Sequence, residues 1–557
     1  MKRFFERKRC VINAILILFL LTALPLRAQV TYDIYDRINR NMDIFGKIYK
    51  EIALNYVDRI DADKFFEAGI EGMLKTLDPY TVYYNDKNQD ALELITSGKY
   101  GGIGISISIN DTAVVVTDVM QGYEAERKGL RPGDVLKQID GVELKGMKIE
   151  DIRRRVRGQA GTKININAER EGTPLNFNLT RQEIILKSVS YEGFLGNPEE
   201  GIAYIRLDRF SNISENEVAN AIKTLKSKNE LKGLILDLRG NGGGLLESAI
   251  GILNKLVEKN SLLLTTRGNT KDSEKKFFSK EDPLVSAEVP VVILINGGTA
   301  SASEIVAGAV QDLDRGVIIG SKSFGKGLVQ QIKDLDYNSR LKITNARYFT
   351  PSGRWIQEKN YFEENKSGVF LIPESFKQKE FKTLGGRTVY ANGGISPDIE
   401  VKTEPESEIH FALLMKDMFF KYATAYLAKN PGLKVYRAPG NVSEDFKNFV
   451  TASGFLYRSE ADKKIDDLKK IAQKKNYSEK YAEYLNKIEG ELSREKDMEM
   501  DRATDEIKKS IATEINKMLV AEKEQIEEGF SSDVQLQEAI RIIKDNSRYK
   551  GILSVKF

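Results

Sequence analysis

The sequence predicts a chain of the α/β class, with a central parallel sheet, a β-rich segment before it and helical segments at both ends. From residue 201 to about 401, near-continuous apolar strands alternate with helices, which is typical of a parallel sheet covered on both faces. Between 99 and about 181, short strands alternate with glycine turns. Apolar residues recur at helical spacing from 30 to about 77 and again beyond 402.

Size and charge limit the classes of function. The chain has 557 residues, which is too long for one core and predicts several domains. Lys and Arg number 85 and Asp and Glu number 81, for a formal net charge of +4. So small a charge gives no electrostatic reason to expect nucleic acid or an acidic polymer as a partner.

The first 28 residues follow the pattern of a signal peptide. A basic start is followed by an apolar run from Val11 to Leu24, and a small residue, Ala28, precedes Gln29. The apolar run is short for a membrane span. We expect export to the periplasm or cell envelope of a Gram-negative bacterium, with cleavage after Ala28. The alternative is an uncleaved membrane anchor, because Leu26 is a poor third residue before a cut.

Cysteine and histidine are too scarce for several kinds of chemistry. The only cysteine, Cys10, precedes the apolar run, so the mature chain would have no disulfide and no catalytic thiolate. The only histidine, His410, lies in a predicted amphipathic helix, where we expect it to pack or to be solvated rather than to take part in chemistry. A His-rich metal site is excluded, and we expect neither a metal nor a cofactor. The base of any hydrolytic site should therefore not be histidine.

A candidate nucleophile lies where an apolar strand gives way to a helix. The segment Gly297–Glu304 reads Gly-Gly-Thr-Ala-Ser-Ala-Ser-Glu and places Ser301 at the start of that helix. The free backbone N–H groups of a helix start can hold the oxyanion that forms when a serine attacks a carbonyl. The same residues also fit a capping box between Ser301 and Glu304, which is a common way to start any helix.

Two glycine-rich segments accompany this serine. Gly240–Gly244 follows a strand and could aim an N–H group at an oxygen, or form only a tight turn. Gly320–Gly327 resembles a phosphate loop but has Gly327 where the metal-binding Ser or Thr is required, which argues against a nucleotide site. A lysine with a lowered pKa can accept a serine proton. Lys326 is such a candidate, although it could equally be a solvated loop residue.

In combination these segments resemble the carboxyl-terminal processing (tail-specific) proteases, a serine peptidase family. The resemblance rests on the Ser-Ala-Ser-Glu segment at Ser301, the Phe-Gly-Lys-Gly segment at Lys326 and the Asp-Leu-Arg-Gly-Asn-Gly-Gly-Gly segment that begins at Asp237. Further matches in the same order are Leu77–Pro79, Tyr348–Arg354 and Gly393–Asp398.

The resemblance implies a fold and a set of catalytic roles. The fold would be a crotonase/ClpP-like spiral α/β protease core with an inserted β-rich PDZ domain. Ser301 would be the nucleophile, and Lys326, which follows it by 25 residues, would be the general base. Gln330, one helical turn past the lysine, would orient that base. The oxyanion would be held by the N–H of Gly243 or Gly244 and by that of Ala302.

The β-rich segment resembles a PDZ domain. The segment Tyr100–Ile105 matches the carboxylate-binding loop, whose predicted binding residues are Gly101, Gly102, Ile103 and Gly104. In such a domain, loop N–H groups bind a terminal carboxylate while the peptide adds as an edge strand. An apolar groove wall is expected from Ile103, Ile105, Ile152 and Val156. The resemblance therefore predicts an exported endopeptidase that recognises protein C-termini and cleaves near them.

The predicted boundaries are 1–28 for the signal peptide, 29–98 for an N-terminal helical region, 99–182 for the PDZ domain, 183–401 for the protease core and 402–557 for a C-terminal helical domain. The segment 358–392 is an insertion relative to the family pattern. The charged C-terminal helices could form a bundle, a homodimer contact or simply a solvated face, and an adaptor protein is a further candidate partner. Two alternatives to the protease are a catalytically silent PDZ adaptor and a crotonase-like acyl enzyme.

Overall fold

The computed structural model describes residues 34–85, 89–110, 112–361, 379–402 and 407–554. The described residues up to Tyr83, together with Tyr361, belong to one compact unit, and the other described residues form a second, larger unit. The strand β1 (Val82–Tyr84) spans the sequence boundary between the units. The predicted signal peptide lies outside the described residues. Within those residues, no helix is long and apolar enough to cross a membrane.

The smaller unit is helical, as the apolar spacing predicts. A helix covers residues 34–55, and α2 (Ala62–Leu74) follows after a short loop. Asp61 caps α2 by accepting a hydrogen bond from the Lys64 N–H at 3.1 Å. Tyr49 links the two helices, because its hydroxyl donates to the Ala62 carbonyl and its ring stacks on Phe65.

The β-rich segment folds as a small sheet whose first strand lies at an edge. Its five main strands are ordered β3-β4-β5-β7-β8, and β6 pairs with β5. A separate two-stranded ribbon, β2 with β9, carries the chain into and out of this sheet. The elements are α3 (Gln89–Ser97), β2 (Lys99–Gly102), β3 (Ile105–Asn110), β4 (Ala113–Val119), α4 (Glu124–Arg127), β5 (Val135–Ile139), β6 (Val142–Glu143), α5 (Ile149–Val156), β7 (Lys163–Arg170), β8 (Thr173–Thr180) and β9 (Gln182–Ile185).

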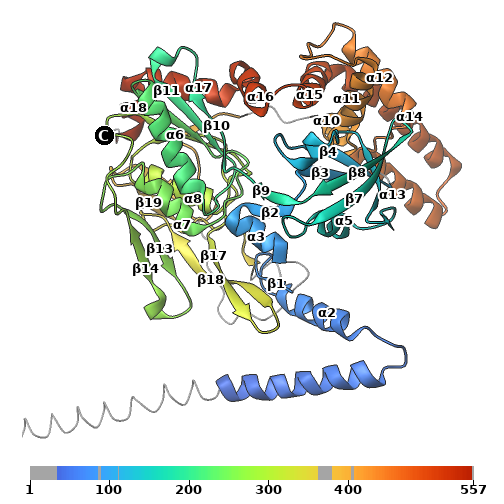
Figure 1. The fold of residues 1–557 in the computed structure, drawn as a ribbon, viewed down its shortest axis with the longest axis horizontal. Coiled ribbons are helices and arrows are strands. Elements are labelled where there is room, and N and C mark those ends of the chain that lie inside the picture. Colours follow the sequence, from blue (N-terminus) through green and yellow to red (C-terminus); the bar gives the residue numbers. More distant parts are fainter. Residues whose placement is uncertain (1–33, 86–88, 111, 362–378, 403–406, 555–557) are drawn as a thin grey trace, which may run out of the picture. The chain divides into compact units, whose positions relative to one another are not determined.

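The central sheet has six strands in the order β10-β11-β12-β15-β16-β21. β10 and β11 are antiparallel, and every other neighbouring pair is parallel. This is the buried parallel sheet that the apolar runs predict (Figure 1). Its strands are β10 (Val189–Phe194), β11 (Ile202–Leu207), β12 (Gly233–Asp237), β15 (Val291–Ile295), β16 (Val317–Gly320) and β21 (Ile399–Glu400).

Alternate residues of these strands enter two different cores. In β11, Ile205 packs in a core with residues of α6, α7 and α8, whereas Tyr204 packs in a core with residues of α17 and α18. Side chains alternate between the two faces of a strand, so the two helix groups cover opposite faces of the sheet. The bounds are α6 (Ser214–Lys228), α7 (Leu246–Asn254), α8 (Ala302–Asp312), α17 (Val534–Lys544) and α18 (Asn546–Leu553).

This arrangement differs from the expected boundary at residue 402. The expectation assigns all of 402–557 to a separate helical domain, but α17 and α18 pack on the central sheet. The Tyr549 hydroxyl accepts a hydrogen bond from the Val291 N–H at 3.0 Å, within the central strand β15. The last helices are therefore a layer of the core, because they bury a sheet face that would otherwise be exposed and apolar.

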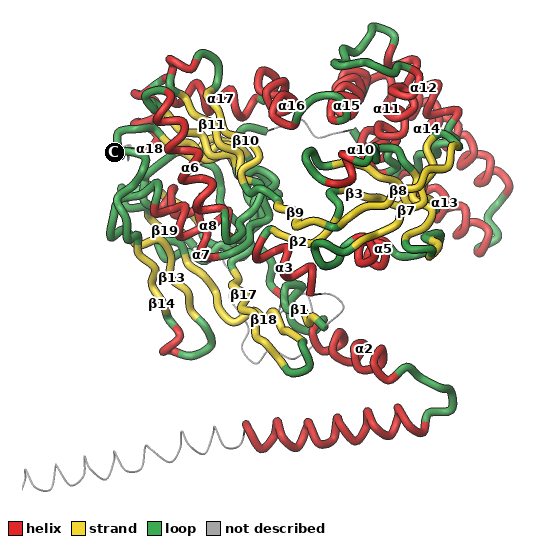
Figure 2. The backbone as a smooth tube through the Cα atoms, viewed as in Figure 1, coloured by secondary structure: helices red, strands yellow, loops and turns green. Residues whose placement is uncertain are grey.

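A second sheet contains β13 and β14, together with the hairpin of β17 and β18 (Figure 2). Inside the predicted insertion, the described residues form a small hairpin of β19 and β20. The strands are β13 (Leu262–Arg267), β14 (Lys275–Phe278), β17 (Leu328–Leu335), β18 (Ser339–Phe349), β19 (Glu380–Lys382) and β20 (Thr388–Tyr390).

The remaining C-terminal helices have a core of their own. Phe419 stacks on Phe446 with ring centroids 5.0 Å apart, and Ile511 is fully buried beside them. His410 packs here as expected, with its Nε2 2.7 Å from the Ser510 hydroxyl. The helices are α10 (Glu408–Met415), α11 (Met418–Lys429), α12 (Val442–Ala452), α13 (Glu460–Lys474), α14 (Glu479–Arg502), α15 (Thr504–Lys517) and α16 (Glu522–Gly529).

Candidate active site

Ser301 lies at a sharp turn between β15 and α8. Its backbone has φ 57° and ψ −116°, a left-handed conformation that is strained for a residue with a side chain. The turn is held because the Thr299 hydroxyl donates to the Leu238 carbonyl at 2.8 Å and the Ala300 N–H donates to the Asn241 carbonyl at 3.0 Å. The side chain of Ser301 therefore projects from the start of a helix and is partly exposed.

The Glu304 carboxylate joins the turn at Ser301 (the serine turn) to the loop 321–327 that contains Lys326 (the lysine loop). One of its oxygens, Oε2, accepts from the Ser301 N–H at 2.8 Å and from the Lys326 N–H at 2.9 Å. The other, Oε1, accepts from the Gly325 N–H at 2.7 Å and from the Ser323 hydroxyl at 2.5 Å. Glu304 is fully buried, and burial raises its pKa although these four hydrogen bonds oppose the shift. Two segments that are distant in sequence thus meet on one carboxylate.

The lysine loop follows β16 and is fixed on both sides of Lys326. Before it, the Phe324 N–H donates to the Thr299 carbonyl at 3.0 Å. After it, the Gly327 N–H donates to Gln357 Oε1 at 2.8 Å, and the Gly327 carbonyl accepts from the Trp355 indole N–H at 2.9 Å. The backbone of Lys326 is therefore held beside the start of α8.

Gln330 is on a strand, so its predicted place one helical turn after Lys326 is wrong. Residues 328–335 form β17, in which the register shifts between Val329 and Gln330. The Gln330 Nε2 donates to the Thr344 hydroxyl of β18 at 3.0 Å. A separation of four residues suggested a helical turn, but the alternating pairing of β17 with β18 forms a hairpin instead.

The glycine-rich loop Gly240–Gly244 lies directly against Ser301. A Cβ built on Gly243 would be 2.8 Å from the Ser301 Cβ and 2.9 Å from the Ala302 nitrogen, and φ is +95° there. Only glycine allows so close an approach. The Gly243 N–H donates to Asn241 Oδ1 at 2.9 Å. Among the hydrogen bonds of the described residues, none uses the N–H of Gly244 or Ala302.

A buried ion pair supports the far end of α8. Asp312, its last residue, pairs with Arg354 at 2.8 Å, and both side chains are almost fully buried. Arg354 also donates to Gln311 Oε1 at 2.7 Å, while the Ser352 N–H donates to Asp312 at 3.0 Å. Breaking such a pair leaves an uncompensated buried charge. The match of Tyr348–Arg354 to the family pattern therefore has a structural basis in this ion pair.

Comparison with known proteins identifies the family of this chain. The model of "Peptidase family S41" matches residues 201–365. The carboxy-terminal-processing protease of Bartonella bacilliformis is 37% identical over 345 residues, which cover 61% of this chain and 78% of that protein. The chain belongs to peptidase family S41.

Other comparisons cover the rest of this S41 peptidase. The family models are "Activating protease CtpB N-terminal domain" over 27–88, "PDZ domain" over 115–170 and "Probable PDZ-protease, C-terminal helical domain" over 409–543. The carboxy-terminal processing protease CtpA of Bacillus subtilis is 29% identical over 68% of this chain and 78% of that protein. A solved photosystem II D1 C-terminal processing protease is 27% identical over 65% of this chain and 92% of that chain, with a TM-score of 0.35.

The S41 peptidase is thus a serine protease with a PDZ domain. Its predicted carboxylate-binding residues lie where β2 leads into the edge strand β3. Gly101 and Gly102 pair with β9, Ile103 is buried, and Gly104 has φ +81° beside Tyr123. Among the expected groove residues, Ile105 is partly exposed. The others, Ile103, Ile152 and Val156, are buried in the PDZ core.

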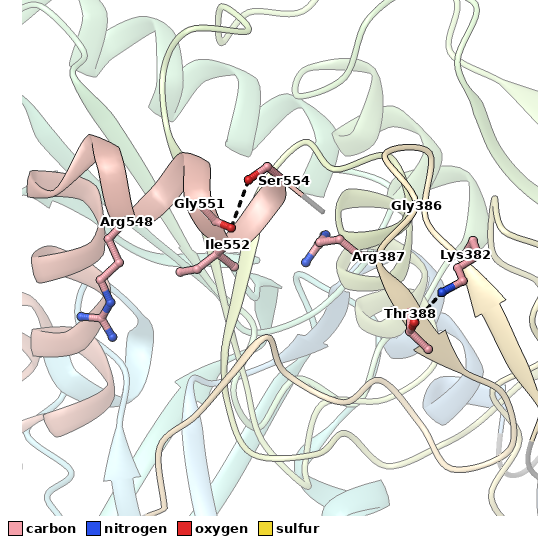
Figure 3. Close-up of a pocket in the computed structure, with 8 residues that line it drawn as sticks. All are labelled: Lys382, Gly386, Arg387, Thr388, Arg548, Gly551, Ile552 and Ser554. Carbon is pink, nitrogen blue, oxygen red and sulfur yellow. Dashed lines mark hydrogen bonds between the residues drawn. The ribbon is translucent and has the colours of Figure 1, made fainter. Parts of the chain in front are cut away.

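A separate hollow of the S41 peptidase lies between the β19–β20 hairpin and α18 (Figure 3). It has a volume of about 710 Å³ and is lined by Lys382, Gly386, Arg387, Thr388, Arg548, Gly551, Ile552 and Ser554. Arg387 pairs with Asp314 and Asp398, and Arg548 pairs with Glu538. Because carboxylates already neutralise both arginines, the hollow is not a strong anion site. The described residues contain no group of three or more His, Cys, Asp or Glu side chains that could hold a metal.

Proposed function

We propose that this S41 peptidase is an exported endopeptidase that recognises protein C-termini and cleaves near them with a Ser301–Lys326 dyad. The observation that carries the proposal is the Glu304 carboxylate, whose Oε2 accepts the backbone N–H groups of both residues. This common acceptor holds the backbones of the proposed nucleophile and the proposed amine base side by side. Gln330 is proposed to orient the lysine through its amide. No metal or cofactor is required.

The proposed reaction proceeds by two acyl-transfer steps. The Ser301 hydroxyl attacks the scissile carbonyl while Lys326 Nζ takes its proton, and the lysine then protonates the departing amine as the C–N bond breaks. In the second step, water attacks the acyl ester as Lys326 takes a proton from the water. The ester bond then breaks, the proton returns to Ser301, and the new carboxyl terminus is released.

The oxyanion of each step is proposed to bind the N–H groups of Gly244 and Ala302. These two are favoured over Gly243, since the Gly243 N–H already donates to Asn241. Gly243 would serve instead as the glycine that lets the loop touch Ser301. Ala302 is the first residue of α8, and Gly244 follows the glycine that touches Ser301, so both N–H groups are fixed dipoles of the kind that stabilises a developing charge.

The delivery of chain ends is proposed for the loop Gly101–Gly104 and the edge strand β3. β3 pairs with β4 on one side only within its sheet, so a peptide strand can add to its other edge. Four further parts of the proposal rest on the sequence. They are a signal peptide at 1–28, an envelope substrate, an adaptor, and a homodimer through the C-terminal helices.

The experiment that tests the proposal is cleavage of a denatured protein, such as labelled β-casein, by purified variants. We expect Ser301→Ala and Lys326→Ala each to lower the rate by at least about 100-fold, as loss of a nucleophile or of a general base does. Lys322→Ala is the matched control, because Lys322 lies in the same loop and pairs with Glu358 at the surface. Full activity in either dyad variant would contradict the proposal, and a silent PDZ adaptor would show no cleavage even in the wild type.

A further inference from the structure

Arg239 connects the glycine-rich loop to the C-terminal helix α17. It lies immediately before Gly240–Gly244, and its guanidinium contacts two carboxylates at once. Nη1 and Nη2 donate to the two oxygens of Asp533 at 2.9 and 2.6 Å, while Nε and Nη2 donate to Asp237 at 3.0 and 2.6 Å. Planar, two-point contacts of this kind fix the orientation of a guanidinium as well as its position.

Asp533 is well placed to hold this arginine. It caps α17 by accepting from the N–H groups of Gln535 and Leu536 at 3.1 and 3.0 Å, so its own position is set by that helix. Although burial raises the pKa of Asp533, its hydrogen bonds and attraction to Arg239 outweigh this and lower the pKa below its ordinary value. The carboxylate is therefore ionised at neutral pH.

The other aspartate cannot replace this contact. Asp237 is 4% exposed and lies only two residues before Arg239, at the end of β12. Asp237 holds the guanidinium through Nε and Nη2, whereas the partners of Nη1 among the described residues both come from the start of α17, 294 or more residues later: Asp533 Oδ1 at 2.9 Å and Gln535 Oε1 at 3.1 Å. The Arg239 side chain is 18% exposed, so without Asp533 its Nη1 would keep only the neutral Gln535 acceptor and could exchange it for water.

The loop that Arg239 begins has to be placed accurately. Its far end lies against Ser301, where the space for a Cβ on Gly243 is already filled. Asn241 supports the middle, since its side chain donates to the Leu207 carbonyl at 2.7 Å. Misplacing a catalytic group by about 1 Å can cost about 100-fold in rate. A small rotation at the start of the loop would therefore change the position and direction of the N–H groups at its end.

We propose that Asp533 is a positioning residue of this protease, which acts through Arg239 to aim the Gly243–Gly244 peptide at the oxyanion. The inference rests on the oxyanion role proposed above. It makes the C-terminal segment part of the catalytic apparatus, because an element outside the S41 match at 201–365 completes the support of the loop.

The test compares variants of the full chain on a quenched fluorescent peptide, with kcat and KM measured separately. Asp533→Ser keeps a side-chain oxygen for the α17 cap but is too short to reach Arg239. We expect kcat to fall about 10-fold, an effect smaller than the loss of a whole oxyanion donor, with KM unchanged. Lys544→Gln is the control, because it removes an exposed ion pair between the same helix and Glu200.

A second measurement separates positioning from general stability. In a double-mutant cycle, Asp533→Ser should add nothing to the loss of kcat caused by Arg239→Gln, because Arg239→Gln already removes the contact with Asp533. Additive losses, or a wild-type kcat in Asp533→Ser, would overturn the inference. If Asp533→Ser does not fold, Asp533→Asn is assayed by the same two criteria. Ser301→Ala is run in parallel: if it still cleaves, the proposed function fails, whereas an inactive Ser301→Ala with a fully active Asp533→Ser refutes only the role of Asp533.

Discussion

At the scale of single residues, Glu304 determines the geometry of the site. Glu304 is the third residue of α8, and its side chain accepts hydrogen bonds from both the serine turn and the lysine loop. Four donors surround the buried carboxylate, which satisfies the requirement that a buried polar group be hydrogen-bonded. These four hydrogen bonds offset the free-energy cost of burying the carboxylate, and they hold the Ser301 turn and the Lys326 loop in one place.

The contact of Gly243 with Ser301 gives a prediction at the same scale. We expect Gly243→Ala to reduce activity at least about 100-fold, because its Cβ would lie 2.6 Å from the Ala300 carbonyl oxygen and the loop would have to move away from the oxyanion. Peptide cleavage measured beside thermal melting checks this. Gly242→Ala is the matched control, since a Cβ there meets nothing within 4 Å. Equal activity in the two variants would refute the assigned role of Gly243.

The sequence predicted Ser301 and Lys326 as candidates and predicted Glu304 only as part of a helix cap. The capping pattern contains the correct residue, because the N3 glutamate does accept the Ser301 N–H. Its second contact, to the lysine loop, depends on how β15 and β16 pair, and no local pattern carries that information. The same lack of information about strand pairing explains why Gln330 was expected one helical turn after Lys326, since its conformation depends on the pairing of β17 with β18.

At the scale of elements, α17 is the least expected part of the fold. Its apolar face completes the second core of the central sheet, in which Leu536 is fully buried. The sequence predicted the helical character but not the partner, because helical periodicity shows that a face is buried without showing against what. The strands were easier to predict, since their continuous apolar runs require cover on both faces.

The role of α17 in the core predicts a coupled loss of stability and activity. Leu536→Ala should lower the free energy of unfolding of the protease core by about 2–5 kcal/mol, as large-to-small changes in a core do. Urea unfolding, with residual protease activity as the probe at each urea concentration, measures this loss. Val534→Ala, at a position that is 53% exposed on the same helix, should leave the midpoint almost unchanged. If Leu536→Ala instead unfolded only the other C-terminal helices, α17 would belong to their domain.

At the scale of the whole molecule, recognition and cleavage are assigned to different parts of one chain. The PDZ domain has an edge strand and the loop proposed to bind a terminal carboxylate, and the S41 core carries the proposed dyad. Apolar periodicity and the family motifs predicted the order of these parts along the chain. It could not predict that the C-terminal segment returns to the sheet, because that contact joins residues more than 250 positions apart.

Recognition of chain ends by the PDZ domain predicts that the protease prefers substrates with a free C-terminal carboxylate. Amidation of the C-terminus of a peptide substrate should raise KM about 10-fold, because the loop N–H groups lose a charged acceptor worth about 1.5–3 kcal/mol per hydrogen bond. Steady-state cleavage of the free and amidated peptides measures this. A peptide in which one internal side-chain carboxylate is amidated is the control. Equal KM values for free and amidated ends would argue against a carboxylate site in the PDZ loop.

The central claim, that Lys326 activates Ser301, is tested most directly by the rate at which a fluorophosphonate labels the protein, with the labelled peptide located by mass spectrometry. The account predicts a single adduct on Ser301, with the labelling rate of Lys326→Ala lowered by at least about 100-fold and that of Lys322→Ala unchanged. An adduct on another residue, or wild-type labelling of Lys326→Ala, would contradict it.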